Sequence, residues 1–139
     1  MVGDAPRACV IDNSVVVSWL YPAQTSAYTE ALLERIGRST LHVAFIWPAE
    51  YANTAAALVR RGLLDEAQGE EMIALAGRLN LNVDRMPPAS DALYRLARQY
   101  ALSAYDAAYL ELALRLRCPL ATRDTALERA ARAEGLFLI

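Results

Sequence analysis

The chain has 139 residues, which is the length of one domain and enough to bury a hydrophobic core, so we expect a single domain over residues 1–139. Its net charge is −2, and all 14 of its basic residues are arginine. This acidic balance argues against nucleic-acid binding through bulk positive charge, so such a contact needs local arginine patches or bound metal ions. The absence of lysine excludes mechanisms that need a catalytic or phosphate-binding lysine.

Hydropathy adds an expectation about partners and location. Hydrophobic residues make up 55% of the chain, which suggests that a partner covers part of the surface, and a homodimer is the default expectation. No apolar run approaches the roughly 20 residues of a membrane span, and the N-terminus lacks the basic flank and long apolar core of a signal peptide. We therefore expect a cytoplasmic protein without membrane contact.

Strands and helices alternate from the start of the chain. The apolar run at residues 9–11 lacks the alternation of a half-exposed strand, so it predicts a strand covered on both faces. Helices are expected at residues 14–21 and 25–37, where Pro22 separates them. The next elements are a second buried strand at residues 41–46 and a helix at residues 47–62.

The second half of the chain continues this alternation. The helix expected at residues 104–117 is apolar nearly all round at first, so it should be buried centrally. The pattern predicts a three-layer α/β/α sandwich with a mostly parallel sheet of four to five strands and right-handed crossovers. The other expected helices are at residues 65–79, 89–100 and 125–134, and the other strands are at residues 80–86, 119–122 and 136–139.

The sulfur and imidazole side chains are too few for a metal site of the zinc type. Cys9 and Cys118 are the only cysteines, and both lie in apolar stretches, so we expect buried core thiols. His42 is the only histidine and has no second His or Cys partner. We therefore expect it to be a strand residue rather than a ligand.

Four acidic residues are predicted to share one edge of the sheet. Asp12 and Asp124 come directly after strands, and Glu50 and Asp106 lie in the first turns of helices. The carboxyl ends of parallel strands and the amino ends of the following helices meet at one edge, so the four acids should point to it. Each acid could separately be a helix cap or the partner of a helix dipole. The polar residues beside them that could add oxygen ligands or hydrogen bonds are Ser14, Asn53 and Thr122.

Clustered carboxylates have a chemical consequence. They repel one another unless some are protonated or a cation lies between them. A set of oxygen ligands without His or Cys suits a hard cation, Mg²⁺ or Mn²⁺. Such an ion lowers the pKa of a bound water and stabilises charge on a phosphate, which is the chemistry of metal-dependent phosphodiester hydrolysis.

The segments that carry these acids resemble the four acidic motifs of the PIN-domain ribonucleases, and in particular the VapC toxins of bacterial toxin-antitoxin pairs. They read VIDNSVV, PAEYANTAAALVRRG, LSAYDAAYLELALRL and PLATRDTAL. The resemblance covers nearly the whole chain, in order and at spacing typical of the family. The block YDAAYLELA followed by LATRD is the most specific part, and each motif keeps its acid.

The resemblance implies an activity and an assignment of roles. It implies an endoribonuclease that is built as a homodimer, acts on RNA and is held inactive by a cognate VapB-like antitoxin. Asp12, Glu50, Asp106 and Asp124 would form the catalytic group, with the metal on the three aspartates and Glu50 holding or orienting metal and water. The resemblance leaves open which carboxylate is the general base. Supporting roles would fall to Ser14, Asn53 and Thr122.

The antitoxin can be expected to use two features of the protein. An arginine from the partner could form bidentate hydrogen bonds to two of the acids and compete with metal. An amphipathic helix of the partner could lie in an apolar groove between the expected helices. The residues expected to form this groove are Leu33, Ala57, Leu58, Met72 and Leu75.

Two other classes of function fit parts of the sequence. A phosphotransfer domain of the receiver or haloacid-dehalogenase kind also has an Asp after its first strand, but its mechanism normally needs a lysine, and this chain has none. The other class is a catalytically silent PIN-like interaction module whose acids are only helix caps. Such a module would gain no stability from Mn²⁺, so thermal melts with and without the ion separate the two readings.

Overall fold

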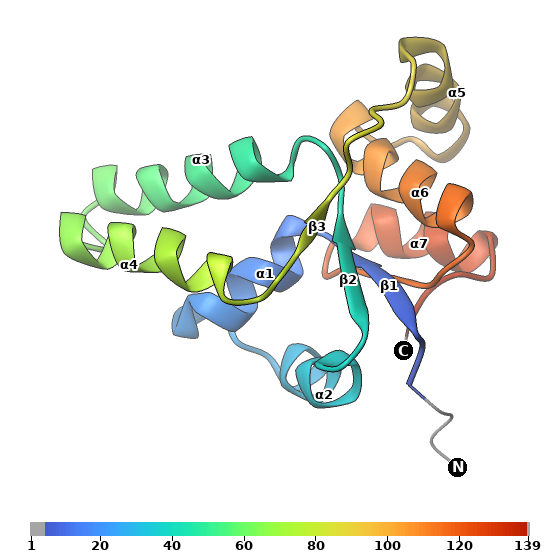
Figure 1. Ribbon diagram of the computed structural model, residues 1–139. Coiled ribbons are helices and arrows are strands. Elements are labelled where there is room, and N and C mark those ends of the chain that lie inside the picture. Colours follow the sequence, from blue (N-terminus) through green and yellow to red (C-terminus); the bar gives the residue numbers. More distant parts are fainter. Residues whose placement is uncertain (1–4, 139) are drawn as a thin grey trace.

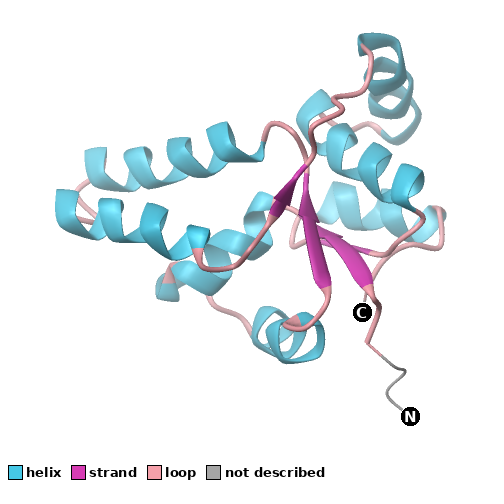
Figure 2. Ribbon diagram, viewed as in Figure 1, coloured by secondary structure: helices cyan, strands magenta, loops and turns pink. Residues whose placement is uncertain are grey.

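The computed structural model describes residues 5–138 of the chain. A sheet of four parallel strands, in the order β3-β2-β1-β4, lies between helices (Figures 1 and 2). This arrangement confirms the predicted α/β/α sandwich and parallel sheet. Among the described residues, the strands are β1 (Ala8–Ile11), β2 (Thr40–Val43), β3 (Asn82–Val83) and β4 (Leu120–Ala121).

Helices cover both faces of the sheet. Figure 1 shows α1 to α4 on one side and α5 to α7 on the other. None of the described helices is long and apolar enough to cross a membrane. The helices are α1 (Asn13–Leu20), α2 (Ala27–Ile36), α3 (Trp47–Arg60), α4 (Glu66–Gly77), α5 (Ser90–Tyr100), α6 (Ala104–Leu116) and α7 (Thr125–Ala133), with a short 3₁₀ helix, η1 (Pro22–Gln24).

The strand order creates a reversal beside β1. The chain steps outward from β1 to β2 and β3 through α1 to α4, then returns through α5 and α6 to β4 on the other side of β1. Because right-handed crossovers on the two sides of such a reversal cover opposite faces, the helices after β1 and β4 diverge. The carboxyl ends of these two strands therefore open onto a crevice, which is where ligands bind in open α/β sheets.

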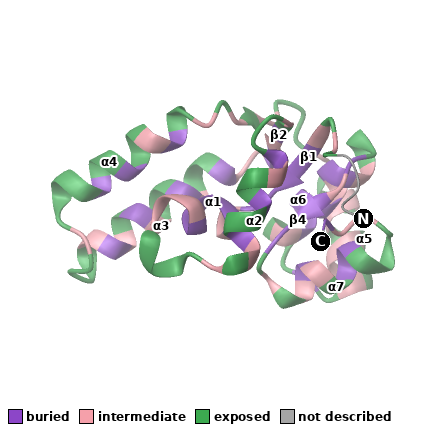
Figure 3. Ribbon diagram, turned by 90° about the horizontal axis from the view of Figure 1, so that it is seen from below, coloured by how far each residue is buried: buried purple, intermediate pink, exposed green. Residues whose placement is uncertain are grey.

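Strand β1 is the centre of the core. Cys9, Val10 and Ile11 are completely buried, and Val10 pairs with His42 of β2 and Leu120 of β4. This confirms the prediction of a strand covered on both faces, and both cysteines are buried thiols as expected. Figure 3 shows the buried residues concentrated on the sheet and on the helix sides that face it.

Helix α6 packs directly on the sheet, as its apolar composition predicts. Ala107 and Ala108 are buried and small, so the helix approaches β1 closely, while Tyr109 and Leu110 fill the space on either side. Its N-terminus is capped by Ser103, whose hydroxyl accepts a hydrogen bond from the Asp106 amide at 3.1 Å. The rigid helix holds Asp106 in its first turn at the edge of the sheet.

The C-terminal segment departs from expectation. The sequence predicts a strand at residues 136–139, but among residues 5–138 this segment makes only an isolated bridge between Phe137 and Leu120, and position 139 lies outside the described residues. The Phe137 side chain packs on Tyr28 of α2 and Arg132 of α7, while two backbone hydrogen bonds hold the segment to Leu120. Asp124 is the N-cap of α7, because its side chain accepts a hydrogen bond from the Leu127 amide.

Candidate active site

The four predicted acids line one cavity at the carboxyl ends of β1 and β4. It has a volume of about 330 Å³ and lies where the strand order reverses. The loop after β1 and helix α1 form one wall, α3 and α6 contribute one acid each, and the loop after β4 contributes the fourth. The lining residues are Asp12, Asn13, Ser14, Val17, Gln24, Glu50, Thr54, Asp106, Tyr109 and Asp124.

Asp12 is a buried acid with a dense set of hydrogen bonds. Its residue is 4% exposed. Oδ1 accepts hydrogen bonds from the Ser14 hydroxyl at 2.5 Å and the Val15 amide at 3.2 Å, and Oδ2 accepts one from the Thr122 hydroxyl at 2.5 Å. The Val15 contact makes Asp12 the N-cap of α1. The same side chain therefore caps α1 and lines the acidic cavity.

Two hydroxyl groups connect Asp12 to the loop before α7. Thr122 donates to Asp12 and accepts a hydrogen bond from the Asp124 amide at 2.9 Å. Ser14 donates to Asp12 and accepts one from the Arg123 amide at 3.0 Å. These contacts fix the loop after β4 against the loop after β1. Both residues adjoin the acidic cavity, Ser14 in its lining and Thr122 directly behind Asp12.

Glu50 is held by a residue that the sequence reasoning did not single out. Its Oε1 accepts a hydrogen bond from the Tyr109 hydroxyl at 2.6 Å. Tyr109 is 1% exposed and lies three residues after Asp106, so both project from the same side of α6. Burial, together with the charge and hydrogen bond of Glu50, raises the pKa of Tyr109 far above its usual range, so the phenol stays a hydrogen-bond donor. In the sequence, the spacing of three residues between Asp106 and Tyr109 indicates that Tyr109 lies on the same side of the helix as the acid.

The polar residue of α3 that lines the cavity with Glu50 is Thr54, and not the predicted Asn53. Asn53 is exposed and does not line the cavity. Thr54 lines it, and its hydroxyl accepts a hydrogen bond from the Asn13 side chain at 3.1 Å. On a helix, the side chains three and four residues after Glu50 project to either side of the Glu50 side chain. Only Thr54, four residues after Glu50, faces α1. The Thr54 hydroxyl also donates to the Glu50 carbonyl at 3.0 Å.

The carboxylates interact electrostatically across the cavity. Burial, and to a smaller extent the charge on Asp106, raise the pKa of Asp12 to about 6 against the effect of its hydrogen bonds. Burial and the charge on Asp106 raise the pKa of Glu50, and burial and the charge on Asp124 raise that of Asp106. The ion pairs formed between described residues involve none of these acids. Their negative charge is thus without a cationic partner within residues 5–138.

The donors of the cavity fit a hard divalent cation. The atoms in its lining that could bind a metal are carboxylate, hydroxyl and amide oxygens, and no His or Cys lines it. Within the described part of the chain, no three acidic, His or Cys side chains are grouped closely enough to hold an ion by themselves. Mg²⁺ usually binds through one or two carboxylates and keeps several waters. The spacing therefore suits a hydrated ion shared with a substrate rather than an ion in a closed cage.

Comparisons with known proteins agree with this architecture. A family model described as the PIN domain matches residues 9–133, a segment that contains all four acids. Among solved structures, PAE2754 from Pyrobaculum aerophilum aligns with a TM-score of 0.70 and 20% sequence identity, over 90% of this chain and 80% of that chain. At this identity the likeness shows the fold alone. A comparison with curated proteins found no match. The chain belongs to the PIN domain family.

Proposed function

We propose that this protein is a metal-dependent endoribonuclease of the VapC type, a toxin that hydrolyses RNA phosphodiester bonds and is neutralised by a VapB-like antitoxin. PIN domains are generally nuclease folds and usually bind a divalent metal. The observation that carries the proposal is the convergence of four acids, from four separate segments, on one cavity. Asp12, Glu50, Asp106 and Asp124 are the proposed catalytic residues.

The three aspartates would hold a hydrated ion, with some of the contacts made through its waters, because no three acidic side chains of the described residues lie close enough to hold an ion by themselves. Oδ1 of Asp12 already accepts two hydrogen bonds and Oδ2 accepts one, so Oδ2 keeps an acceptor position. Asp124 uses Oδ2 for the cap of α7, so Oδ1 is its candidate ligand atom. Asp106 completes the set from α6. A bound Mg²⁺ or Mn²⁺ would lower the pKa of a water molecule and offset the charge that develops on the phosphate.

Glu50 would orient the attacking water and accept its proton. The hydrogen bond from Tyr109 fixes Oε1, which leaves Oε2 to contact the water. Burial and the charge on Asp106 raise the pKa of Glu50 above its usual range, which favours proton acceptance near neutral pH. Thr122 and Ser14 hold Asp12 in place during this step, because each donates a hydrogen bond to it.

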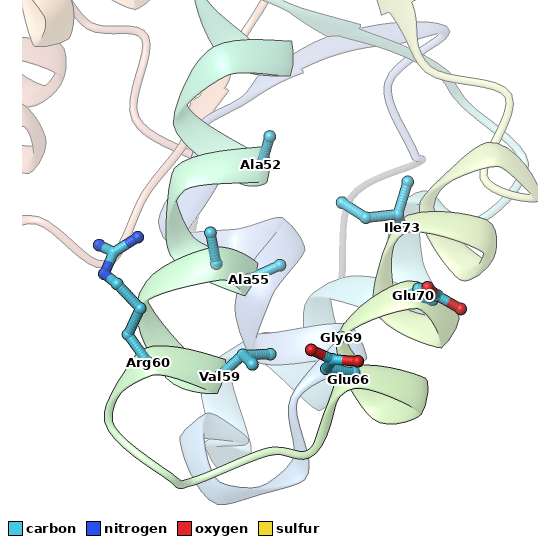
Figure 4. Close-up of a pocket in the computed structure, with 9 residues that line it drawn as sticks. Ala52, Ala55, Val59, Arg60, Glu66, Gly69, Glu70 and Ile73 are labelled. Atoms are coloured by element: carbon cyan, nitrogen blue, oxygen red, sulfur yellow. The ribbon is translucent and has the colours of Figure 1, made fainter.

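The proposed antitoxin would dock on the groove between α3 and α4 (Figure 4). None of the five residues expected to form a groove lines this one, and two of them, Leu58 and Met72, are buried in the core. The groove has a volume of about 530 Å³ and is lined by small residues of α3 and by Ile73, which is 47% exposed. Such a surface suits the apolar face of a partner helix. Glu66, Glu70 and Arg60 at its rim would select the partner's charges.

A homodimer is part of the same proposal. Large hydrophobic residues are exposed on α2, after α3 and on α4, where Leu33 is 41%, Leu63 51% and Ile73 47% exposed. Such exposure supports a covered surface, by a second copy or by the antitoxin. A catalytically silent interaction module is not favoured, because Glu50 and Asp106 line the cavity although neither is the N-cap of its helix.

Cleavage of labelled single-stranded RNA by the purified protein tests the proposal. Mg²⁺ or Mn²⁺ should support cleavage, and excess EDTA should stop it. Asp106→Asn removes one ligand charge with little change in volume, so it should lower the rate at least about a hundredfold. Asp91→Asn, on the exposed side of α5, is the matched control and should cleave like the parent. Cleavage that persists in excess chelator, or in the Asp106→Asn variant, contradicts the site assignment.

A further inference from the structure

A second cavity lies beside the acidic one, on the other side of the loop after β4. It has a volume of about 340 Å³ and is lined by Tyr28 of α2, Glu128 and Arg132 of α7, Arg123 of the loop, and Phe137. We call it the α2–α7 pocket. Thr122 lines it too, and the same residue donates a hydrogen bond to Asp12 in the acidic cavity. The hydrogen-bonded side chains of Thr122 and Asp12 therefore lie between the two cavities.

One wall of the α2–α7 pocket is a stack of flat side chains. The rings of Tyr28 and Phe137 are stacked with centroids 6.1 Å apart and an interplanar angle of 22°. The guanidinium carbon of Arg132 lies 4.4 Å from the centroid of Phe137. Arg132 is held in this position by Glu128, whose Oε2 accepts a hydrogen bond from Nε at 3.0 Å. The Tyr28 hydroxyl donates to the Leu138 carbonyl at 2.9 Å, which fixes the other end of the stack.

The exposed end of this stack is a planar cation. The Arg132 side chain is 51% exposed, so its guanidinium plane can accept a further flat group. Unstacked nucleobases bind proteins by stacking on aromatic rings and on arginine planes, with hydrogen bonds to their edges. The Glu128 side chain is 40% exposed and could accept hydrogen bonds from amino or imino groups of a base. The pocket thus combines a stacking surface with an acceptor for a base edge.

The position of the pocket fits a strand that also reaches the acids. Asp124, Glu128 and Arg132 are spaced four residues apart, so they follow one side of α7 from the acidic cavity to the stack. Eight residues of helix correspond to about 12 Å, a separation that neighbouring nucleotides of one strand can cover. Arg123 lines the α2–α7 pocket, and its guanidinium donates to the carbonyl of Gln24, a residue that lines the acidic cavity.

Charge supports the same path. The acidic cavity repels phosphate groups, and the chain has a net charge of −2, so an RNA strand needs local positive charge beside the acids. Arg123 and Arg132 supply it on this side. We propose that the α2–α7 pocket binds one nucleobase of single-stranded RNA, next to the phosphate that lies at the acidic cavity. The identity of this ligand rests on the proposed function.

Binding of RNA tests the pocket separately from cleavage. The probe is a fluorescein-labelled pool of short single-stranded RNAs of random sequence, bound in Mg²⁺ to an Asp106→Asn background and followed by fluorescence anisotropy. Arg132→Ala should weaken binding about tenfold, the effect of losing one stacked base. Arg129→Ala, elsewhere on the exposed surface of α7, makes the same charge change and should alter Kd less than about twofold.

Two further variants separate stacking from charge. Arg132→Lys keeps the charge but loses the planar group, so it should bind RNA as weakly as Arg132→Ala. Phe137→Leu removes the ring under Arg132 and should also weaken binding, with circular dichroism confirming that the half-buried site still folds. Full affinity in Arg132→Lys would mean a simple phosphate contact and would overturn the base-binding pocket. Unchanged affinity in Arg132→Ala would overturn it as well.

Sequencing of the 5′ ends produced from the same RNA pool gives a second readout. The parent should prefer particular bases near the cut, and Arg132→Ala should lose that preference while Arg129→Ala keeps it. Cleavage with unchanged preference and affinity in Arg132→Ala refutes the pocket and leaves the proposed function standing. Arginine-dependent binding without any cleavage refutes the proposed function and leaves the pocket standing. Failure of the parent to bind RNA refutes both.

Discussion

Burial of the Asp12 side chain disfavours its charged form. The residue is 4% exposed, and its burial raises the pKa to about 6. Between about pH 4 and pH 6, the folded protein holds a proton that the unfolded chain has released. The proton on Asp12 therefore stabilises the folded protein below pH 4, and this contribution to the free energy of unfolding is lost as the pH rises from about 4 to about 6. The linkage corresponds to a loss of about 3 kcal/mol from this one group in metal-free buffer.

Asp12→Asn should remove that pH dependence. In EDTA, the variant should gain stability relative to the parent as the pH rises from about 4 to about 7, by about 2 to 3 kcal/mol in total. The gain arises because Asn has no charge to desolvate. Urea denaturation of both proteins at a series of pH values measures the difference. Asp91→Asn, which removes an exposed carboxylate on α5, should show a difference that stays flat. A flat difference for Asp12→Asn would contradict a buried, proton-binding Asp12.

Tyr109 acts on the same cavity through Glu50. Tyr109→Phe keeps the packing of the ring in α6 and removes only the hydroxyl that donates to Glu50. We expect a loss of about 1 kcal/mol in the free energy of unfolding and a cleavage rate lowered about tenfold, because Glu50 then loses its fixed orientation. Denaturation and single-turnover cleavage measure the two effects.

The control for Tyr109→Phe is Tyr51→Phe. Tyr51 is also a buried tyrosine, and its hydroxyl donates to the Met72 carbonyl at 2.7 Å, away from the acids. This variant should lose similar stability while it keeps the parent cleavage rate. Equal cleavage by the two variants would mean that Tyr109 has only a structural role.

At the scale of the elements, local pattern was sufficient where one factor decided the structure. The unbroken apolar run 9–11 predicted a strand buried on both faces, because only a covered strand tolerates it. The apolar circumference of α6 predicted central burial for the same reason. The order of strands and helices then predicted which edge holds Asp12, Glu50, Asp106 and Asp124.

The sequence pattern did not predict the structure where a tertiary contact decided between two conformations or residues that fit the pattern equally well. The choice between Asn53 and Thr54 depends on which side of α3 faces α1, and the Asn13–Thr54 hydrogen bond shows that side. The segment 136–138 has the alternation of a strand, yet its side chains pack on α7 and it makes only one bridge. Tyr109 became recognisable only once α6 and α3 were known to face each other.

At the scale of the whole molecule, the sheet topology explains why the acids meet. β1 and β4 are neighbours in the sheet but distant in sequence, and their following helices cover opposite faces. The loops after them therefore face each other, and Thr122 and Ser14 link them through Asp12. The crossovers between them bring α3 and α6 to the same edge, with one acid each. The fold thus gathers negative charge that it does not neutralise internally among the described residues.

A divalent cation should therefore stabilise the folded protein. If Mg²⁺ or Mn²⁺ binds the folded state only, the free energy of unfolding rises by RT ln(1 + [L]/Kd), about 2.7 kcal/mol at a hundredfold excess over Kd. The gain should be larger at pH 7 than at pH 5, because protons compete with the ion for Asp12, whose pKa is about 6. Denaturation in EDTA and in each metal, at matched ionic strength with NaCl, measures it. Asp106→Asn should lose most of the gain, whereas Asp91→Asn should keep it. Equal stability with and without metal at pH 7 would show that the acids do not bind a divalent cation.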